Sequence, residues 1–282
     1  MAYTVILVDE PAEGVRRITL NRPEKRNALF HPLRGEILQA LREADQDDSI
    51  QVSIVRGAGK CFSAGYDLGG GNNGLDEPFY TPGGDGHIAR HVTDGWMSIW
   101  DLAKPVLAQV HGYCLAGGSE LASGCDLIYV AEDAQIGYPA VRFGVADMHF
   151  HAWTMGMRKA MEAMLTGDSM SGLEAVRVGW ANEAFPVEEL DDAVVAVASR
   201  IAKLPPDIVQ INKRVVHRQM EVMGLRTGIR IGTELCALGT RQESLQEFMR
   251  QARGGLTKAL TNRDSPFGDY RTAEQQPSAN KA

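Results

Sequence analysis

The order of strand and helix patterns along the chain constrains its fold more than any other feature of the sequence. Five segments have the short apolar or alternating pattern of strands, the first two as a hairpin around a Pro-Ala-Glu-Gly turn: residues 3–8, 15–20, 52–55, 106–110 and 127–130. Helical spacing marks residues 30–44 and 88–102 in the same half. From about residue 155 onward only helical spacing remains, in residues 157–165, 172–178, 190–204, 208–222 and 243–252. This order predicts an α/β core with a helical C-terminal extension.

We divide the chain accordingly into a core of residues 1–200, a helical region of residues 201–265 and a polar, flexible tail of residues 266–282. Within the core, residues 69–86 (GGGNNGLDEPFYTPGGDG) are too rich in Gly, Asn and Pro for regular structure. They lack the Gly-Lys-Ser/Thr ending of a phosphate-binding loop. A loop of this length is more often a functional flap than a surface insertion without a role, and both interpretations stay open.

The composition is that of an ordinary globular protein, and it excludes several function classes. Of 282 residues, 44% are hydrophobic and 23% charged, and the net charge of -7 argues against a nucleic-acid or anionic-membrane surface. No apolar run approaches about 20 residues, and the N-terminal apolar run lacks the basic segment of a signal peptide. The four cysteines have no metal-like spacing, which favours reduced thiols. We therefore predict a cytoplasmic protein with no metal and no membrane span.

One carboxylate stands in an otherwise small and apolar segment, residues 112–126 (GYCLAGGSELASGCD). This residue, Glu120, directly follows Gly117, Gly118 and Ser119. It fits the first turn of a helix, where the helix dipole favours a negative charge. A catalytic acid in a dry pocket is the alternative. The segment alone leaves both interpretations open.

Three segments occur in the order that one enzyme family requires. They are NRPEKRNAL at residues 21–29, CFSAGYDL at residues 61–68, and the segment around Glu120, followed by CDLIYVAEDAQIGYPAVRFG. Together they resemble the crotonase superfamily, whose best-known members are enoyl-CoA hydratases and isomerases, over residues 3–270. The resemblance implies a spiral of β-β-α units with a helical C-terminal region that forms a trimer, commonly doubled to a hexamer. It also implies an acyl-CoA substrate and no separate cofactor, since coenzyme A is part of the substrate.

The chemistry of acyl thioesters explains why such glycine-rich segments are needed. Reactions at the α or β carbon pass through an enolate, and each fixed N–H donor aimed at its oxygen contributes about 3 kcal/mol in comparable oxyanion holes. The resemblance assigns these donors to the amides of Tyr66 and Gly117. It assigns the role of general acid/base to Glu120, one helical turn beyond Gly117. Apolar surroundings would suit that role, because they raise the pKa of a carboxyl towards the working range.

The resemblance also implies a coenzyme A site. Lys25 and Arg26 lie where relatives hold the nucleotide phosphates, and a solvated charge pair is the alternative. Ala28 and Ala64 lie where backbone contacts hold the adenine and the pantetheine. The same site includes Gly65, Tyr66, Asp67, Leu68, Gly117 and Pro139. Near the C-terminus, family members carry Phe and Lys against the adenine where this chain has Ala259 and Asn262, and Lys258 or Arg263 would have to compensate.

One departure from the family pattern bears on the reaction. Hydratases use a second glutamate where this chain has Ala140, so a two-carboxylate hydration does not carry over. Asp147, His149 and His151 offer replacement acids or bases, and for the histidines packing or a surface position is an equal alternative. We therefore keep three functions open: an enzyme of the enoyl-CoA hydratase/isomerase type using Glu120, an acyl-CoA isomerase or carbon–carbon bond hydrolase using Glu120 and Asp147, and an acyl-CoA-binding protein that has lost catalysis. We expect straight-chain hydration not to be the preferred reaction.

Overall fold

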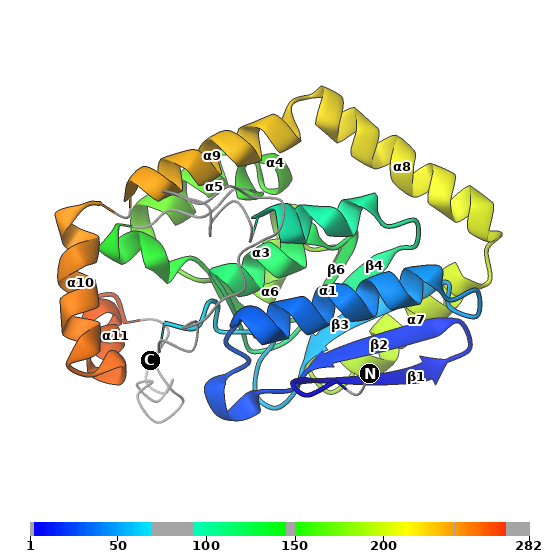
Figure 1. Cartoon of the computed structure of the whole chain (residues 1–282), viewed down its shortest axis with the longest axis horizontal. Coiled ribbons are helices and arrows are strands. Elements are labelled where there is room, and N and C mark those ends of the chain that lie inside the picture. Colours follow the sequence, from blue (N-terminus) through cyan, green and yellow to red (C-terminus); the bar gives the residue numbers. More distant parts are fainter. Residues whose placement is uncertain (1–2, 69–92, 145–149, 240, 269–282) are drawn as a thin grey trace, which may run out of the picture.

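The computed structural model describes residues 3–68, 93–144, 150–239 and 241–268. The loop at residues 69–86 and two candidate acids or bases, Asp147 and His149, lie outside these ranges. The described part contains two sheets with helices packed around them (Figure 1). This arrangement confirms the predicted α/β class.

The larger sheet has six strands in the order β1-β2-β3-β4-β6-β9. β1 (Ile6–Ala12) and β2 (Val15–Leu20) are antiparallel, and Ala12 pairs with Val15. The predicted hairpin is thus confirmed, with a shorter turn than expected. The other strands follow in parallel: β3 (Val52–Gly57), β4 (Val106–Val110), β6 (Leu127–Ala131) and β9 (Glu183–Phe185). β3 and β4 are buried almost throughout because central parallel strands are covered on both faces.

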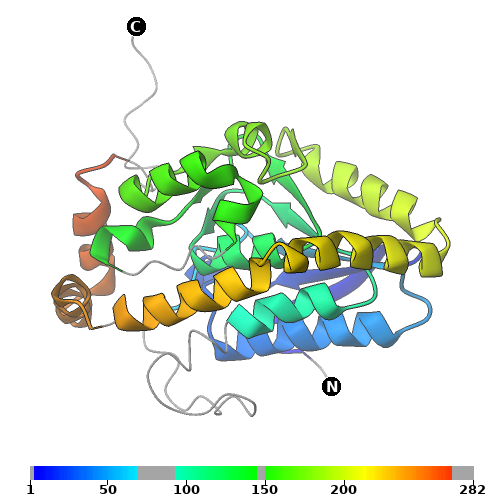
Figure 2. The ribbon, with the colours of Figure 1, turned by 90° about the horizontal axis from the view of Figure 1, so that it is seen from above.

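Two long helices, α1 (His31–Gln46) and α7 (Leu190–Ala202), cover opposite faces of this sheet (Figure 2). Each buries one apolar stripe at helical spacing: Leu33, Ile37 and Leu41 in α1, and Leu190, Val194 and Ala198 in α7. Both helices lie within two residues of the predicted ranges. The helical period of their apolar residues is therefore sufficient to locate them.

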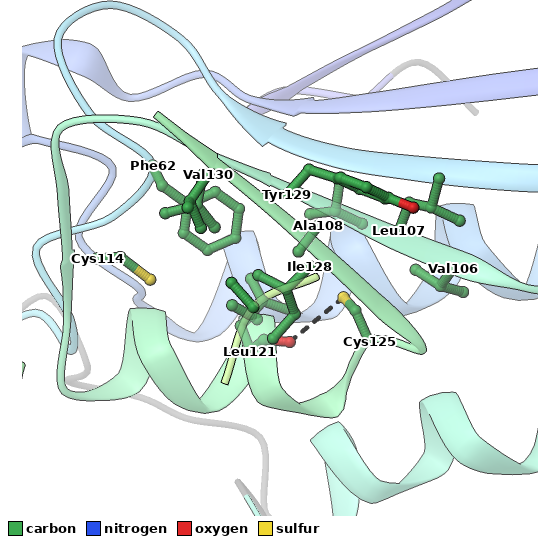
Figure 3. Packing of buried hydrophobic residues seen from close by; sticks show 14 of the residues in the cluster. Phe62, Val106, Leu107, Ala108, Cys114, Leu121, Cys125, Ile128, Tyr129 and Val130 are labelled. Atoms are coloured by element: carbon green, nitrogen blue, oxygen red, sulfur yellow. Dashed lines mark hydrogen bonds between the residues drawn. The ribbon is translucent and has the colours of Figure 1, made fainter. Parts of the chain in front are cut away.

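The smaller sheet consists of β5 (Tyr113–Leu115), β7 (Gln135–Gly137) and β8 (Met170–Ser171). β5 leads almost directly into α3 (Gly117–Gly124), all of whose residues are buried. Leu121 of α3 packs with Ile128 of β6 in the main core (Figure 3). α3 is thereby packed against the larger sheet, and Glu120 lies on this buried helix.

The all-helical second half predicted from the sequence is wrong. β9 pairs in parallel with β6 and completes the larger sheet, and β8 pairs antiparallel with β7. Both strands are too short, three and two residues, to show a period of two in the sequence. Their extended form depends on the strand edges that the first half of the chain presents to them.

The remaining helices lie mainly in the second half of the chain. Residues 93–97 are helical, and the other helical elements are η1 (Pro23–Lys25), η2 (Ser98–Asp101), η3 (Pro139–Phe143), α4 (His151–Thr154), α5 (Gly156–Thr166), α6 (Gly172–Arg177), α8 (Pro206–Val222), α9 (Leu225–Gly239), α10 (Glu243–Arg253) and α11 (Leu256–Asp264). α8 and α9 run along one side of the molecule, and α10 and α11 lie at one end (Figure 1). Within the described ranges, no helix has the length and apolar character needed to cross a membrane.

Candidate active site

The segments that carry the predicted site run side by side: residues 26–29, 63–67, 113–116 and 135–137. The amide of Leu29 donates to the carbonyl oxygen of Gly65 at 2.8 Å, and the amide of Leu115 donates to that of Ser63 at 3.0 Å. β5 then pairs in parallel with β7. The three sequence motifs are therefore neighbours in space, as the resemblance implied.

A buried asparagine, Asn27, holds the first two motifs together. Its side-chain amide donates to the carbonyl oxygens of Ala58 and Cys61, at 2.9 Å each, and its own carbonyl oxygen accepts from Ser63 Oγ at 2.9 Å. Its φ of 52° lies in the left-handed region, which Asn tolerates better than most residues. The sequence reading assigned Asn27 no role, although it stands within the motif NRPEKRNAL.

The two predicted oxyanion donors lie in segments that approach each other closely. A Cβ added to Gly65, whose φ is 97°, would lie 2.8 Å from the carbonyl oxygen of Leu115 and 3.5 Å from the amide nitrogen of Gly117. Only glycine permits this approach. Ala116, just before Gly117, has a φ of 46°, a strained value of the kind that is found at functional sites. The structure thus brings the Tyr66 and Gly117 segments together.

Glu120 lies at the centre of this arrangement and is only 2% exposed. Its Oε1 accepts a hydrogen bond from the hydroxyl of Tyr138, and its Oε2 accepts one from the hydroxyl of Tyr66. The indole nitrogen of Trp96 donates in turn to the Tyr66 hydroxyl at 3.1 Å. The helix-start interpretation of Glu120 is confirmed, because it lies in the first turn of α3, and the residue is also buried beside the predicted donors. Its role as a catalytic acid stays a prediction.

The ring of Tyr66 lies directly over Gly117. A Cβ on Gly117 would lie 2.5 Å from Cζ of Tyr66, so the absence of a side chain there makes room for the ring. The sequence reading used only the amide of Tyr66. Its phenol, together with Tyr138 and Trp96, was missed, because nothing in the sequence indicates that these side chains converge on Glu120.

The third candidate base, His151, packs next to this group. It is 1% exposed, and its ring meets that of Tyr138 edge-on with centroids 5.8 Å apart. Its Nε2 lies 3.4 Å from Ser119 Oγ, and its ring stacks with that of Trp180 at 6.4 Å. Among the described candidates for a replacement base, His151 is therefore a buried packing residue one layer behind Glu120.

Ala140, at the position of the family's second glutamate, lies in an apolar environment. It belongs to η3 and is 8% exposed. It shares a cluster of buried side chains with Tyr138, Phe143, Leu245, Phe248 and Ala259. The rings of Phe143 and Phe248 stack at 4.2 Å. The described surroundings of Ala140 are thus those of a hydrophobic core.

The candidate coenzyme A residues differ in exposure: Gly65, Gly117 and Pro139 are buried, whereas others lie at the exposed edge of the same segments. Lys25 and Arg26 are exposed, and the Arg26 guanidinium lies 5.8 Å from the centroid of the Tyr113 ring. Asp67 forms an ion pair with Arg22 at 2.6 Å, which places it as a support for the loop. Leu68 is 38% exposed. This edge therefore carries two exposed cations and one exposed apolar side chain.

The C-terminal residues considered for the adenine end of coenzyme A differ in exposure. Ala259 is buried, whereas Lys258 and Asn262 are exposed. Arg263 pairs with Asp264 at 2.7 Å, and Asp264 also pairs with the buried guanidinium of Arg142 at 3.2 Å. Arg263 is thus engaged with its neighbour within α11, and the Arg142–Asp264 pair links α11 to η3.

A thiol nucleophile does not fit this site. Burial raises the pKa of Cys61 to about 11, although the nearby Arg26 guanidinium opposes the rise. The thiol is therefore protonated at neutral pH, and the thiolate is the reactive form of cysteine. Among the described residues, no group of three His, Cys, Asp or Glu side chains is arranged to hold a metal ion.

Comparisons with known proteins place this arrangement in a family. The family model for enoyl-CoA hydratase/isomerase matches residues 10–264. A mitochondrial enoyl-CoA hydratase of Pongo abelii is 31% identical over 247 residues, covering 85% of this chain and 82% of the relative. A crystal structure of an enoyl-CoA hydratase/isomerase from Xanthobacter autotrophicus Py2 superposes with a TM-score of 0.85 at 34% identity, covering 94% of this chain and 99% of that one. A second, an enoyl-CoA hydratase from Mycobacterium smegmatis, gives a TM-score of 0.86 at 29% identity and covers 98% of each chain. The chain therefore belongs to the enoyl-CoA hydratase/isomerase family and has the crotonase fold.

Proposed function

We propose that this protein acts on acyl-CoA thioesters by stabilising an enolate, with Glu120 as the general acid/base and the amides of Tyr66 and Gly117 as the oxyanion hole. One observation carries the proposal. A buried carboxylate lies one helical turn beyond Gly117, whose amide approaches the Gly65–Tyr66 turn. Donors that converge on one point in a dry environment stabilise developing negative charge strongly.

The substrate would enter with its nucleotide phosphates at Lys25 and Arg26. Pantetheine would follow the loop of Ala28 and Ala64, and Gly65, Leu68 and Pro139 would line the way to Glu120. The thioester oxygen would accept hydrogen bonds from the two amides. Glu120 would then remove a proton from the substrate, or from a water that adds to the β carbon, and return it to another carbon. The carboxylate is regenerated, and no cofactor is consumed.

The apolar cluster at Ala140 favours isomerisation within this class. Moving a double bond requires one base that takes a proton from one carbon and returns it at another, and Glu120 suffices. Hydration in the two-carboxylate manner requires a second polar group, and Ala140 with Phe143 and Phe248 supplies none. Asp147 remains a proposed second group for carbon–carbon hydrolysis, and Asp147→Asn tests it with β-oxo acyl-CoA substrates.

The experiment is a panel of straight-chain, branched and cyclic 2-enoyl-, 3-enoyl- and β-oxo acyl-CoA substrates, assayed with the wild type and with Glu120→Gln. We expect the wild type to convert at least one substrate, with 3-enoyl-CoA isomerisation faster than crotonyl-CoA hydration. Glu120→Gln should fold and bind thioesters but turn over about 100-fold more slowly, the usual scale for losing a general acid/base.

Near-wild-type turnover by Glu120→Gln would contradict the assignment. Thioester binding by the wild type without turnover of any substrate would favour the acyl-CoA-binding protein instead. Efficient crotonyl-CoA hydration would overturn the preference for isomerisation.

We also propose that the chain forms a homotrimer or a hexamer in the cytoplasm, with no nucleic-acid or membrane partner. The support is α8, whose buried residues are the polar Lys213 and His217, while Ile208, Ile211, Val215, Val216 and Val222 are exposed. A helix that turns polar residues inward and apolar residues outward has the pattern of a subunit interface.

A further inference from the structure

Two tyrosine hydroxyls hold the two oxygens of Glu120 separately. Tyr138, whose side chain is 0% exposed, donates to Oε1, and Tyr66 donates to Oε2. A carboxylate held at both oxygens cannot rotate about its terminal bond without losing a hydrogen bond. Hydrogen bonds donated to the charged form also favour that form over the protonated one.

Each phenol is itself fixed by the surrounding structure. Tyr66 accepts from Trp96 Nε1 at 3.1 Å, and its ring fills the space over Gly117. Tyr138 stands just before η3, with its ring edge-on to His151 and within the apolar cluster of Ala140. The two donors therefore come from separate elements that are each supported by further packing, as a positioned functional group requires.

We propose, on the basis of the proposed function, that Tyr66 and Tyr138 are positioning residues for Glu120. They fix the orientation of its carboxylate and favour its ionised form, so that the resting enzyme presents a base. In turnover Glu120 accepts one proton, becomes the neutral acid and returns the proton to a different carbon. Both tyrosines keep their own protons throughout. The pair thus provides, around a single carboxylate, an alignment that does not depend on a second carboxylate at position 140.

The titratable groups that face this carboxylate from the described elements are Tyr66, Tyr138 and, behind Tyr138, His151. Removing a hydroxyl that donates to the ionised carboxylate raises the pKa of Glu120. The acidic limb of the kcat/KM profile requires the ionised base, so it must move to higher pH. A hydroxyl that serves only to fill space would leave this limb in place.

The test compares Tyr66→Phe, Tyr138→Phe and the double variant with the wild type. We expect the acidic limb to move up by about one pH unit for each hydroxyl removed, because hydrogen bonds to charged groups are the stronger class. Below the shifted limb kcat/KM should fall about tenfold, with little change in the thioester dissociation constant. Tyr129→Phe is the matched control. Tyr129 is also buried, but it packs with Phe185, and strand alternation turns it away from Ile128, which faces α3. Its profile should match the wild type.

Two further measurements separate positioning from other causes. In the Glu120→Gln background, Tyr138→Phe should have no further effect on rate, because it acts through the carboxylate. Carbon-13 NMR of the Glu120 carboxyl, assigned by its absence in Glu120→Gln, should show its titration moved to higher pH in both Phe variants. This readout reports Glu120 itself and not His151, and it needs no turnover.

The proposal is overturned if both Phe variants keep the wild-type titration of Glu120, or if Tyr138→Phe slows Glu120→Gln as much as it slows the wild type. Failure of the proposed function has a different signature. In that case no acyl-CoA is converted by the wild type, while the NMR titration still decides whether the tyrosines hold the carboxylate.

Discussion

Gly117 and Gly118 are adjacent in the sequence, but a side chain at each would meet different atoms. A Cβ on Gly117 would lie 2.5 Å from Cζ of the Tyr66 ring, which is the end of a movable side chain. A Cβ on Gly118 would lie 2.7 Å from the backbone carbonyl oxygen of Ser63, which cannot move without disturbing the strand contacts of the site. Gly117 therefore makes room for the ring of Tyr66, and Gly118 allows the backbone of α3 to approach the backbone of Ser63.

We predict that Gly117→Ala keeps its melting temperature within a few degrees of the wild type but loses turnover about tenfold, because the displaced Tyr66 ring no longer holds Glu120. Gly118→Ala should lower the free energy of unfolding by about 1–3 kcal/mol, the usual range for overpacking. Thermal melts and steady-state rates measure both. A Gly117→Ala variant with full activity would show that the position of the Tyr66 ring is irrelevant to the reaction.

At the scale of residues, the sequence predicts the groups that belong to motifs and misses those that converge from elsewhere. Glu120, Gly117 and the Tyr66 segment come together as expected, because their motifs are contiguous and ordered. The hydroxyls of Tyr66 and Tyr138 reach Glu120 from 54 and 18 positions away, and no local pattern encodes where such side chains point. For Asn27, the residue type alone could have indicated its position, because Asn adopts the left-handed backbone conformation more often than most residues.

At the scale of elements, long periodic segments were predictable and short or glycine-rich ones were not. α1 and α7 follow from their apolar stripes. The sequence analysis did not predict α9, because Gly228, Gly232 and Gly239 lower the helical propensity of this segment. The absence of a side chain at Gly228 allows α9 to pack closely against Trp153, since a Cβ there would lie 3.2 Å from Cζ2 of the indole ring. The structure of α9 therefore depends on a tertiary contact that the sequence pattern does not contain.

α8 is attached to its own subunit through Lys213 and His217. Lys213 Nζ lies 2.9 Å from Asp126 Oδ2 and donates to the carbonyl oxygens of Ile99 and Lys104 at 3.2 and 2.9 Å. His217 Nε2 lies 3.0 Å from the other oxygen of Asp126. Because Asp126 directly follows the turn after α3, this buried pair links the C-terminal helices to the element that carries Glu120.

We predict that Lys213→Met lowers the free energy of unfolding by about 3–5 kcal/mol, since removing one partner leaves a buried charge without compensation. Urea denaturation at neutral pH measures this loss. Lys203→Met is the control, because Lys203 is exposed at the end of α7, and a surface change of this kind stays within about 0.5 kcal/mol. Equal stability of the two variants would show that the buried pair does not hold α8.

At the scale of the whole molecule, the site and the C-terminal helices depend on each other. The second half of the chain supplies β9 to the larger sheet, and Leu245 and Phe248 of α10 to the cluster around Tyr138 and Ala140. The alignment of Glu120 is therefore a property of both halves. The division at residue 200 stays a prediction. β9 lies on its core side, whereas Leu245 and Phe248 come from beyond it and pack in the same cluster as Tyr138.

The same helices present apolar side chains outward, and this predicts how copies of the chain associate. Ile211 of α8 is 57% exposed, and Leu7 of β1 is exposed to a similar extent, 54%. We expect light scattering with size-exclusion chromatography to give three or six times the mass of one chain for the wild type. Ile211→Glu should give a smaller mass, because a charge within an apolar interface is left without a partner. Leu7→Glu is matched in exposure and chemistry but lies outside the C-terminal helices, and it should keep the wild-type mass. A wild type that is monomeric, or an Ile211→Glu variant that assembles normally, would mean that α8 does not form the interface.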